Sequence, residues 1–399
     1  MRKRRGCNGA FWSVPLIICL VFLYNEYLIY YVTIYMTCSW PMSSLRGEQS
    51  KEETRVMMLT DIHLLGPHRG HWFDKLRREW QMYRSFQSAI SLMRPDAVFF
   101  LDLFKYIFKF KKYMSEINIH FLSDLFDEST ISNYQELVNY VNRFDELFYV
   151  PKNVERQCIL GNHDIGFHDE ISPGRLQFLS HHFSRSFADH IVIGGNHFVL
   201  LNSMTVERDN CPLCTATEHE LEELSRSFDC TKNRTMCSIQ SRPILLLHIP
   251  LYRTSDAHCP DDYDASQEPI KSKRFHVGID CLSNASSHYI LEKLKPRAVF
   301  NGHTHYSCQT WWQPPYSIYE WTLSSFSWRN IPQPAFLLVT VMSNDIQVNK
   351  CFLPNEKTVI GSYVMTALGL IFFLFYYLVS HSRYRQLDSS YHILSGKYD

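Results

Sequence analysis

The stretch AVFNGHTH, residues 298–305, decides the fold. A short apolar run of strand type turns directly into the polar sequence Asn-Gly-His-Thr-His. Short runs of this kind, separated by helical stretches, predict an α/β core whose strands are buried on both faces. In such folds the ligand lies beyond the carboxyl ends of the strands. Other apolar runs along the chain end in the same way, at Asp61-Ile-His63, Gly161-Asn-His-Asp164 and His248.

The rest of the chain fits alternating strands and helices. Apolar periodicity and turn residues predict the element boundaries. We expect helices at 73–93, 131–147, 218–228 and 289–294, strands at 55–60, 97–101, 157–160, 244–247 and 298–300, and hairpins at 191–202 and 336–348.

The strand ends carry a set of metal-ligating side chains. Carboxylate, imidazole and amide oxygen are the donors that suit a pair of divalent first-row cations. A lone histidine such as His248 is more often structural, and Asp61-Ile-His63 alone fits a turn or helix cap. The order and the strand-end placement of the whole set favour a metal site over these readings.

This order of motifs, DxH, GD, GNH[DE], H and GHxH, resembles the calcineurin-like metallophosphoesterase superfamily over residues 56–306. The resemblance implies a β-sandwich flanked by helices and a phosphodiesterase that uses two divalent metal ions, most often Mn²⁺. It implies His163 as a general acid, oriented by Asp164, and water rather than Ser or Cys as the nucleophile. By the same motifs one metal is held by Asp61, His63 and His305, the other by Asn162, His248 and His303, and an aspartate bridges them.

Two aspartates compete for the bridging position. Asp102 and Asp124 each begin an Asp-Leu-Phe tripeptide after an apolar run. Asp124 is favoured because Ser123 stands where the family has a spacer glycine. Residues 102–122 then read as an insertion, or as a surface loop that the fold tolerates. If the insertion displaces Asp124, the chain is a catalytically impaired membrane-bound binding protein of the same fold.

Two apolar segments lie near the chain ends. Residues 11–36 and 359–380 are each long enough to cross a bilayer as a helix, although Glu26 interrupts the first. We expect a signal anchor at 11–36 rather than a cleaved signal peptide. Basic residues in the N-terminus 1–10 and the tail 381–399 place both ends in the cytosol, and the block 39–357 in the lumen.

The cysteines agree with a lumenal block. Nine of the 12 cysteines lie between Cys158 and Cys351, with a Cys-rich loop predicted at 205–240. In a lumen this loop reads as disulfide-stapled, and in a reducing compartment it would suggest zinc. Asn233 and Asn284 begin acceptor sequons for N-glycosylation.

A closer resemblance concerns one membrane-anchored branch of the superfamily. It rests on TDIHLLG at 60–66, GNHDIGFH at 161–168 and HIPLYR at 248–253. It implies removal of ethanolamine phosphate from the second mannose of GPI anchors, which assists export of GPI-anchored proteins from the endoplasmic reticulum. His168 and Arg253 are candidates for substrate contacts.

The partners follow from the same resemblance. They are GPI-anchored proteins or the GPI glycan, the lipid bilayer and cargo-export receptors, in endoplasmic reticulum exit sites, the ER–Golgi intermediate compartment and the Golgi. Lys+Arg and Asp+Glu are balanced at 40 each, which argues against a nucleic acid as partner.

Overall fold

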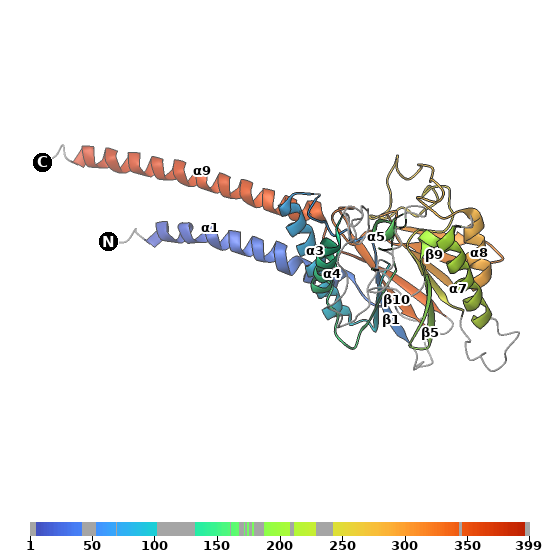
Figure 1. Ribbon diagram of the computed structural model, residues 1–399. Helices are drawn as coiled ribbons and strands as arrows, with labels where there is room; N and C mark the ends of the chain where they lie inside the picture. Colours follow the sequence, from blue (N-terminus) through green and yellow to red (C-terminus); the bar gives the residue numbers. More distant parts are fainter. Residues whose placement is uncertain are drawn as a thin grey trace. The chain divides into compact units, whose positions relative to one another are not determined.

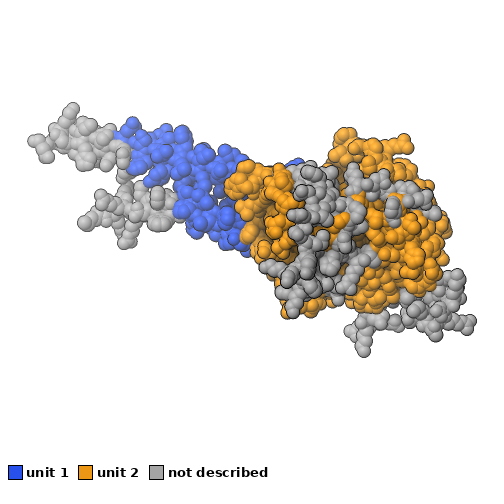
Figure 2. Space-filling view, viewed as in Figure 1, with its two compact units in different colours: residues 1–30, 354–399 blue, residues 31–353 orange. Residues whose placement is uncertain are grey.

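The computed structural model divides the chain into two compact units, residues 1–30 with 354–399 and residues 31–353 (Figure 2). Asp102, Asp124, the whole predicted insertion at 102–122, His168 and the sequon at Asn233 lie outside the described residues. The structure describes residues 5–41, 53–68, 70–101, 132–159, 161–166, 187–207, 211–228, 242–342 and 345–395, with residues 171, 174 and 178.

The larger unit is a mixed α/β structure built on two sheets (Figure 1). The five-stranded sheet has the order β11-β10-β1-β2-β3, and the six-stranded sheet has the order β4-β5-β6-β7-β9-β8. The first sheet comprises β1 (Thr54–Leu59), β2 (Ala97–Phe100), β3 (Glu155–Cys158), β10 (Ala335–Val341) and β11 (Ile346–Phe352). The second comprises β4 (Ala188–Ile193), β5 (Asn196–Leu201), β6 (Ile244–Leu247), β7 (Ala298–Asn301), β8 (Cys308–Trp312) and β9 (Ile318–Thr322).

The two sheets pack face to face over one apolar core. Side chains alternate across a strand, so Val56 and Met58 of β1 face this core while Met57 and Leu59 face the other side. The rings of Phe99 in β2 and Phe198 in β5 meet across the interface with centroids 4.8 Å apart. The strands are therefore buried on both faces, as their continuous apolar runs predict.

Helices cover the outer faces and close a second core. Phe86 of α3 and Phe144 of α4 pack on Phe100 of β2, with ring centroids 5.6 and 5.2 Å apart. A capping box starts α4, because Asn133 and Glu136 each accept a hydrogen bond from the other's backbone N–H. The helices of this unit include α3 (Trp72–Met93), α4 (Tyr134–Leu147), α5 (Asn162–Ile165), α7 (Pro212–Phe228) and α8 (Asn284–Leu294).

The structure corrects two local predictions and adds one element to those predicted from the sequence. A helix is predicted at 218–228 within the Cys-rich segment 205–240, but α7 already begins at Pro212, because proline suits the first position of a helix and Cys214 joins Leu221 on the buried face. The helix predicted at 289–294 begins at Asn284, where the Ser283 hydroxyl caps it by accepting from Ser286 N. The sequence does not predict the hairpin of β8 and β9, because its aromatic and polar residues give no simple apolar alternation.

Three disulfides join cysteines in the described part of the larger unit. Cys211 pairs with Cys214, which agrees with disulfides rather than zinc in that segment; Cys230 and Cys237 lie outside the described residues. The other two pairs, Cys38–Cys351 and Cys259–Cys308, could not be deduced from the sequence. Disulfides of this kind form and persist in an oxidising compartment.

Long apolar helices lie near both ends of the chain. The chain is helical through α1 (Arg5–Leu23), the π-helical turn η1 (Tyr24–Leu28) and α2 (Ile29–Thr37), and again in α9 (Glu356–Ser395). Residues 13–37 and 356–383 are long and apolar enough to cross a membrane.

The π-helical turn carries the polar residues that interrupt the first apolar segment. Asn25 Nδ2 donates to Ser362 Oγ at 2.6 Å, and the Tyr363 hydroxyl donates to Glu26 Oε1 at 2.6 Å. These bonds join the two helices and offset part of the cost of placing a carboxyl group among apolar side chains.

Candidate metal centre

The predicted ligands meet at one edge of the sandwich. β1 and β3 of one sheet, and β6 and β7 of the other, all end there, and each is followed by part of a motif. Because parallel strands bring their carboxyl ends to the same edge, residues far apart in the sequence converge. Those that the structure brings together are Asp61, His63, Asn162, His248, His303 and His305.

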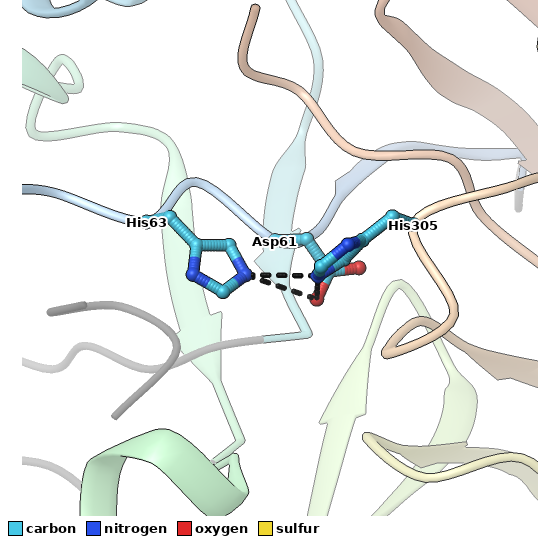
Figure 3. A group of neighbouring side chains, drawn as sticks. All are labelled: Asp61, His63 and His305. Atoms are coloured by element: carbon cyan, nitrogen blue, oxygen red, sulfur yellow. Dashed lines mark hydrogen bonds and ion pairs between the residues drawn. The ribbon is translucent and has the colours of Figure 1, made fainter. Parts of the chain in front are cut away.

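Asp61, His63 and His305 form the first group (Figure 3). The two histidine Nε2 atoms lie 3.0 Å apart, and Asp61 Oδ1 lies 4.0 Å from His63 Nε2 and 3.9 Å from His305 Nε2. The Asp61 side chain is fully buried, and His305 remains partly exposed. The three ligating atoms therefore face one point that is open on the side of His305.

These spacings fit a divalent cation. Ligand atoms each about 2.1 Å from one cation stand about 3.0 to 3.4 Å apart at octahedral or tetrahedral angles. The separations of 3.0 to 4.0 Å in the first group need only a small adjustment to reach that geometry. One carboxylate and two imidazoles also form a donor set that first-row transition metals accept.

Asn162, His248 and His303 form the second group. His248 Nε2 lies 3.1 Å from Asn162 Oδ1 and 3.2 Å from His303 Nδ1. Burial lowers the pKa of His303 to about 3, helped by the nearby His248, while a hydrogen bond to the Ile279 backbone opposes the shift. His303 is thus neutral at physiological pH, which is the form that ligates a metal.

Asp61 ties the two groups together. Its Oδ2 atom accepts hydrogen bonds from His303 N at 3.0 Å and from the Thr60 hydroxyl at 3.1 Å. This close approach depends on Gly302, since a Cβ atom there would stand 2.0 Å from Thr60 Oγ1 and 3.0 Å from Asp61 Oδ2. The glycine of the Gly-His-Thr-His motif is therefore a steric requirement.

The motif backbone is held in an uncommon conformation. The φ angles of Asp61, His63, His303 and His305 are 52°, 46°, 73° and 64°, in the left-handed region that non-glycine residues seldom adopt. Clustered backbone strain of this kind is characteristic of functional sites that the surrounding structure over-determines.

The loop between β9 and β10 supplies part of that surrounding structure. Ser325 Oγ and Asn330 Nδ2 both donate to the Asp61 carbonyl, at 2.6 and 3.2 Å. Ser325 N donates to His305 O, and Phe326 N donates to Thr60 O. Sequence reasoning missed these residues, because nothing in the stretch LSSFSWRN (323–330) marks them as partners of distant motifs.

The proposed acid and the bridging aspartate stay predictions. The structure describes the backbone of His163 in α5, but not its side chain. Asp164 is buried, and its Oδ2 accepts from Gly161 N at 3.1 Å, which closes the turn that presents Asn162. β2 is formed by Ala97–Phe100, so Asp102 follows it closely in sequence.

Comparison with known proteins identifies relatives over nearly the whole length. No protein-family model matches the chain. Metallophosphoesterase 1 of Rattus norvegicus is 36% identical over 98% of this chain and 93% of its own length. The metallophosphoesterase 1 homolog of Caenorhabditis elegans is 35% identical over 96% of this chain and 95% of its own length.

Solved structures show more distant likenesses. A dimetal phosphatase from Danio rerio aligns over 76% of this chain and 99% of its own, at 11% identity and a TM-score of 0.41. A purple acid phosphatase from yellow lupin aligns over 79% of this chain and 54% of its own, at 12% identity and a TM-score of 0.45. Likeness at this level has no bearing on function. At 35–38% identity over most of its length, the chain belongs to the metallophosphoesterase 1 family.

Proposed function

We propose that this chain is a two-metal phosphodiesterase that removes ethanolamine phosphate from the second mannose of GPI anchors. The observation that carries the two-metal part is the convergence of Asp61, His63 and His305 beside Asn162, His248 and His303. The family membership supports the phosphoester part. The GPI substrate rests on the closer resemblance of the motif segments.

In this proposal, each of the two groups of side chains binds one metal ion. When bound, divalent cations polarise a phosphoryl oxygen and lower the pKa of water. Asp61 would supply negative charge to the first site, and the neutral imidazole of His303 would serve the second. His163 would donate a proton to the leaving alcohol, and Asp124 would bridge the two sites.

The choice of Mn²⁺ rests on the family resemblance, and the donor set is compatible with it. Carboxylate and amide oxygens are hard ligands and imidazole nitrogen is a borderline one, and the described site lacks a cysteine among its clustered donors. Thiolate-preferring metals are therefore disfavoured, and a first-row divalent cation with mixed nitrogen and oxygen ligation suits the site.

A membrane-anchored location supports a substrate held at a bilayer surface. Two helices have the length and composition to span a membrane, and the disulfides of the larger unit fit an oxidising lumen. The proposal therefore places the catalytic unit in the lumen of the early secretory pathway, with both termini cytosolic.

A GPI-anchored reporter protein tests the substrate. The full chain, purified in detergent and loaded with Mn²⁺, should shorten the glycan of the reporter by one ethanolamine phosphate, as measured by mass spectrometry. Asn162→Ala, which removes a ligand of the second group, should leave the glycan intact. If the wild-type enzyme cleaves a chromogenic phosphodiester but leaves the reporter unchanged, the GPI assignment is wrong while the reaction class stands.

A further inference from the structure

Arg253 lies in the loop that follows His248 and is held from several sides. Its Nε atom donates to Asp256 Oδ1 at 2.9 Å, and its Nη1 atom donates to Thr322 Oγ1 at 2.9 Å. The guanidinium also stands 5.1 Å from the ring centre of Phe275. Only 9% of the Arg253 side chain is exposed. The side chain is therefore a fixed, buried cation.

One nitrogen of this guanidinium has no hydrogen-bond acceptor in the described part of the chain. This atom, Nη2, is buried. A carboxylate commonly closes the guanidinium fork with both oxygens. Asp256 does not close the fork here: its Oδ1 accepts from Nε, and its Oδ2 accepts from the Ser266 hydroxyl at 3.2 Å. A buried donor without an acceptor is costly, so its retention calls for an explanation.

The surrounding contacts place this group beside the metal centre. Thr322, which holds Nη1, pairs with Asn301 in the parallel ladder of β9 and β7, directly before Gly302 and His303. The loop at 275–281 contacts both Arg253 and the metal-ligand candidate His303. Its Phe275 ring covers the guanidinium, the Cys281 thiol donates to the Arg253 carbonyl, and the Ile279 backbone bonds the His303 side chain.

The guanidinium of Arg253 and two bound metal cations would repel one another. An anion bound between them would offset this repulsion. A phosphodiester carries one negative charge over two oxygens that are not bridging, and a planar guanidinium matches such oxygens well. This inference rests on the proposed phosphodiesterase function. We propose that Arg253 Nη2 donates a hydrogen bond to a nonbridging phosphoryl oxygen of the bound substrate. Asp256 and Thr322 are the positioning residues that hold the guanidinium for it.

Arg156 provides a matched control. It is also a buried arginine, 11% exposed, and its Nη2 atom bonds Asp145 Oδ1 at 2.8 Å. It also stands over an aromatic ring, Phe144, at 5.7 Å. It lies near the start of β3, whereas the motif residues follow the end of that strand. Substitution of either arginine therefore removes a buried ion pair, but only the substitution of Arg253 changes a residue beside the metal centre.

The experiment uses the full chain in detergent with Mn²⁺, bis(p-nitrophenyl) phosphate as the diester and inorganic phosphate as the anion. Arg253→Lys and Arg253→Gln should raise KM roughly tenfold or more, because they lose a charge-assisted hydrogen bond. Phosphate should raise the melting temperature of the wild type and of Arg156→Lys, and should raise it much less in the Arg253 variants. Mn²⁺ affinity should stay unchanged.

The outcomes separate this inference from the proposed function. Unchanged KM and an unchanged phosphate shift in Arg253→Lys or Arg253→Gln would show that Arg253 only folds its loop. If Arg253→Gln does not fold, the lysine variant decides, because it keeps the charge and loses the fork. A wild-type chain that binds phosphate through Arg253 but shows no Mn²⁺-dependent hydrolysis would overturn the proposed function and leave the anion contact standing.

Discussion

Replacing Asp61 by asparagine should abolish nearly all phosphodiesterase activity. The substitution would keep the size of the side chain but remove the negative charge that lies 3.9–4.0 Å from His63 and His305 Nε2. The first metal should then bind far more weakly. A bound cation stabilises the transition state by several kcal/mol, and each 1.36 kcal/mol is about a factor of ten in rate. We therefore expect kcat/KM for bis(p-nitrophenyl) phosphate to fall roughly a thousandfold.

The control for this variant is Asp145→Asn. The Asp145→Asn substitution also removes a negative charge, and with it the ion pair to Arg156. Asp145 lies on α4, apart from the motif residues. The Asp145→Asn variant should keep its activity and its full metal content. Asp61→Asn should retain a folded chain with reduced metal content by elemental analysis. Full activity in a folded Asp61→Asn protein would rule out Asp61 as a metal ligand.

Substituting Gly302 by alanine should have the second-largest effect. The new methyl group would meet Thr60 Oγ1 at 2.0 Å and Asp61 Oδ2 at 3.0 Å, so the backbone or the Asp61 carboxylate must move. Overpacking of this kind costs about 1–3 kcal/mol of folding stability. Displacement of a ligating carboxylate by about 1 Å is expected to reduce activity roughly a hundredfold. Thermal melting and kcat/KM measure the two effects separately.

A second substitution tests the steric cause. Thr60→Gly removes both atoms that stand closest to the new methyl group, Oγ1 at 2.0 Å and Cβ at 2.9 Å. The Gly302→Ala, Thr60→Gly double variant should therefore recover activity relative to Gly302→Ala. Gly369→Ala, where a Cβ atom would meet nothing within 4 Å, should behave like the wild type. Absence of any recovery in the double variant would assign the defect to another cause.

The strand ends were predictable because their signals are local. An apolar run followed by Asp-x-His or Gly-His-Thr-His predicts both a buried strand and the turn that ends it. The structure has strands at these positions. The mixed α/β character and the two-sided burial of the strands follow from the same runs. Helix starts were less predictable. Capping by Ser283 moved the start of α8 five residues earlier than its apolar pattern indicates.

Contacts between distant segments could not be read from the sequence. Ser325 and Asn330 hold the Asp61 carbonyl from more than 260 positions away. Arg253 depends in the same way on Thr322. Such partners are ordinary polar residues in loops, and only the closed sandwich brings them to the site. The pairing of Cys38 with Cys351 has the same origin, since any cysteine spacing permits several connectivities.

The two Asp-Leu-Phe tripeptides show where local reasoning is insufficient. Register and spacing favour Asp124 as the bridging ligand, while the sheet uses Ala97–Phe100 as its strand, close to Asp102 in sequence. Both aspartates lie outside the described residues. Separate Asp102→Asn and Asp124→Asn variants, compared by metal content, distinguish them.

The central claim is that two groups of ligands hold two metal ions that hydrolyse a phosphodiester. Its most direct test is the metal content of the full chain, measured together with hydrolysis of bis(p-nitrophenyl) phosphate. The wild type should bind about two Mn²⁺ ions and turn the diester over. Asn162→Ala should bind about one ion and lose turnover. A folded, metal-loaded wild type with no more hydrolysis than Asn162→Ala would contradict the enzyme and leave a binding protein of the same fold.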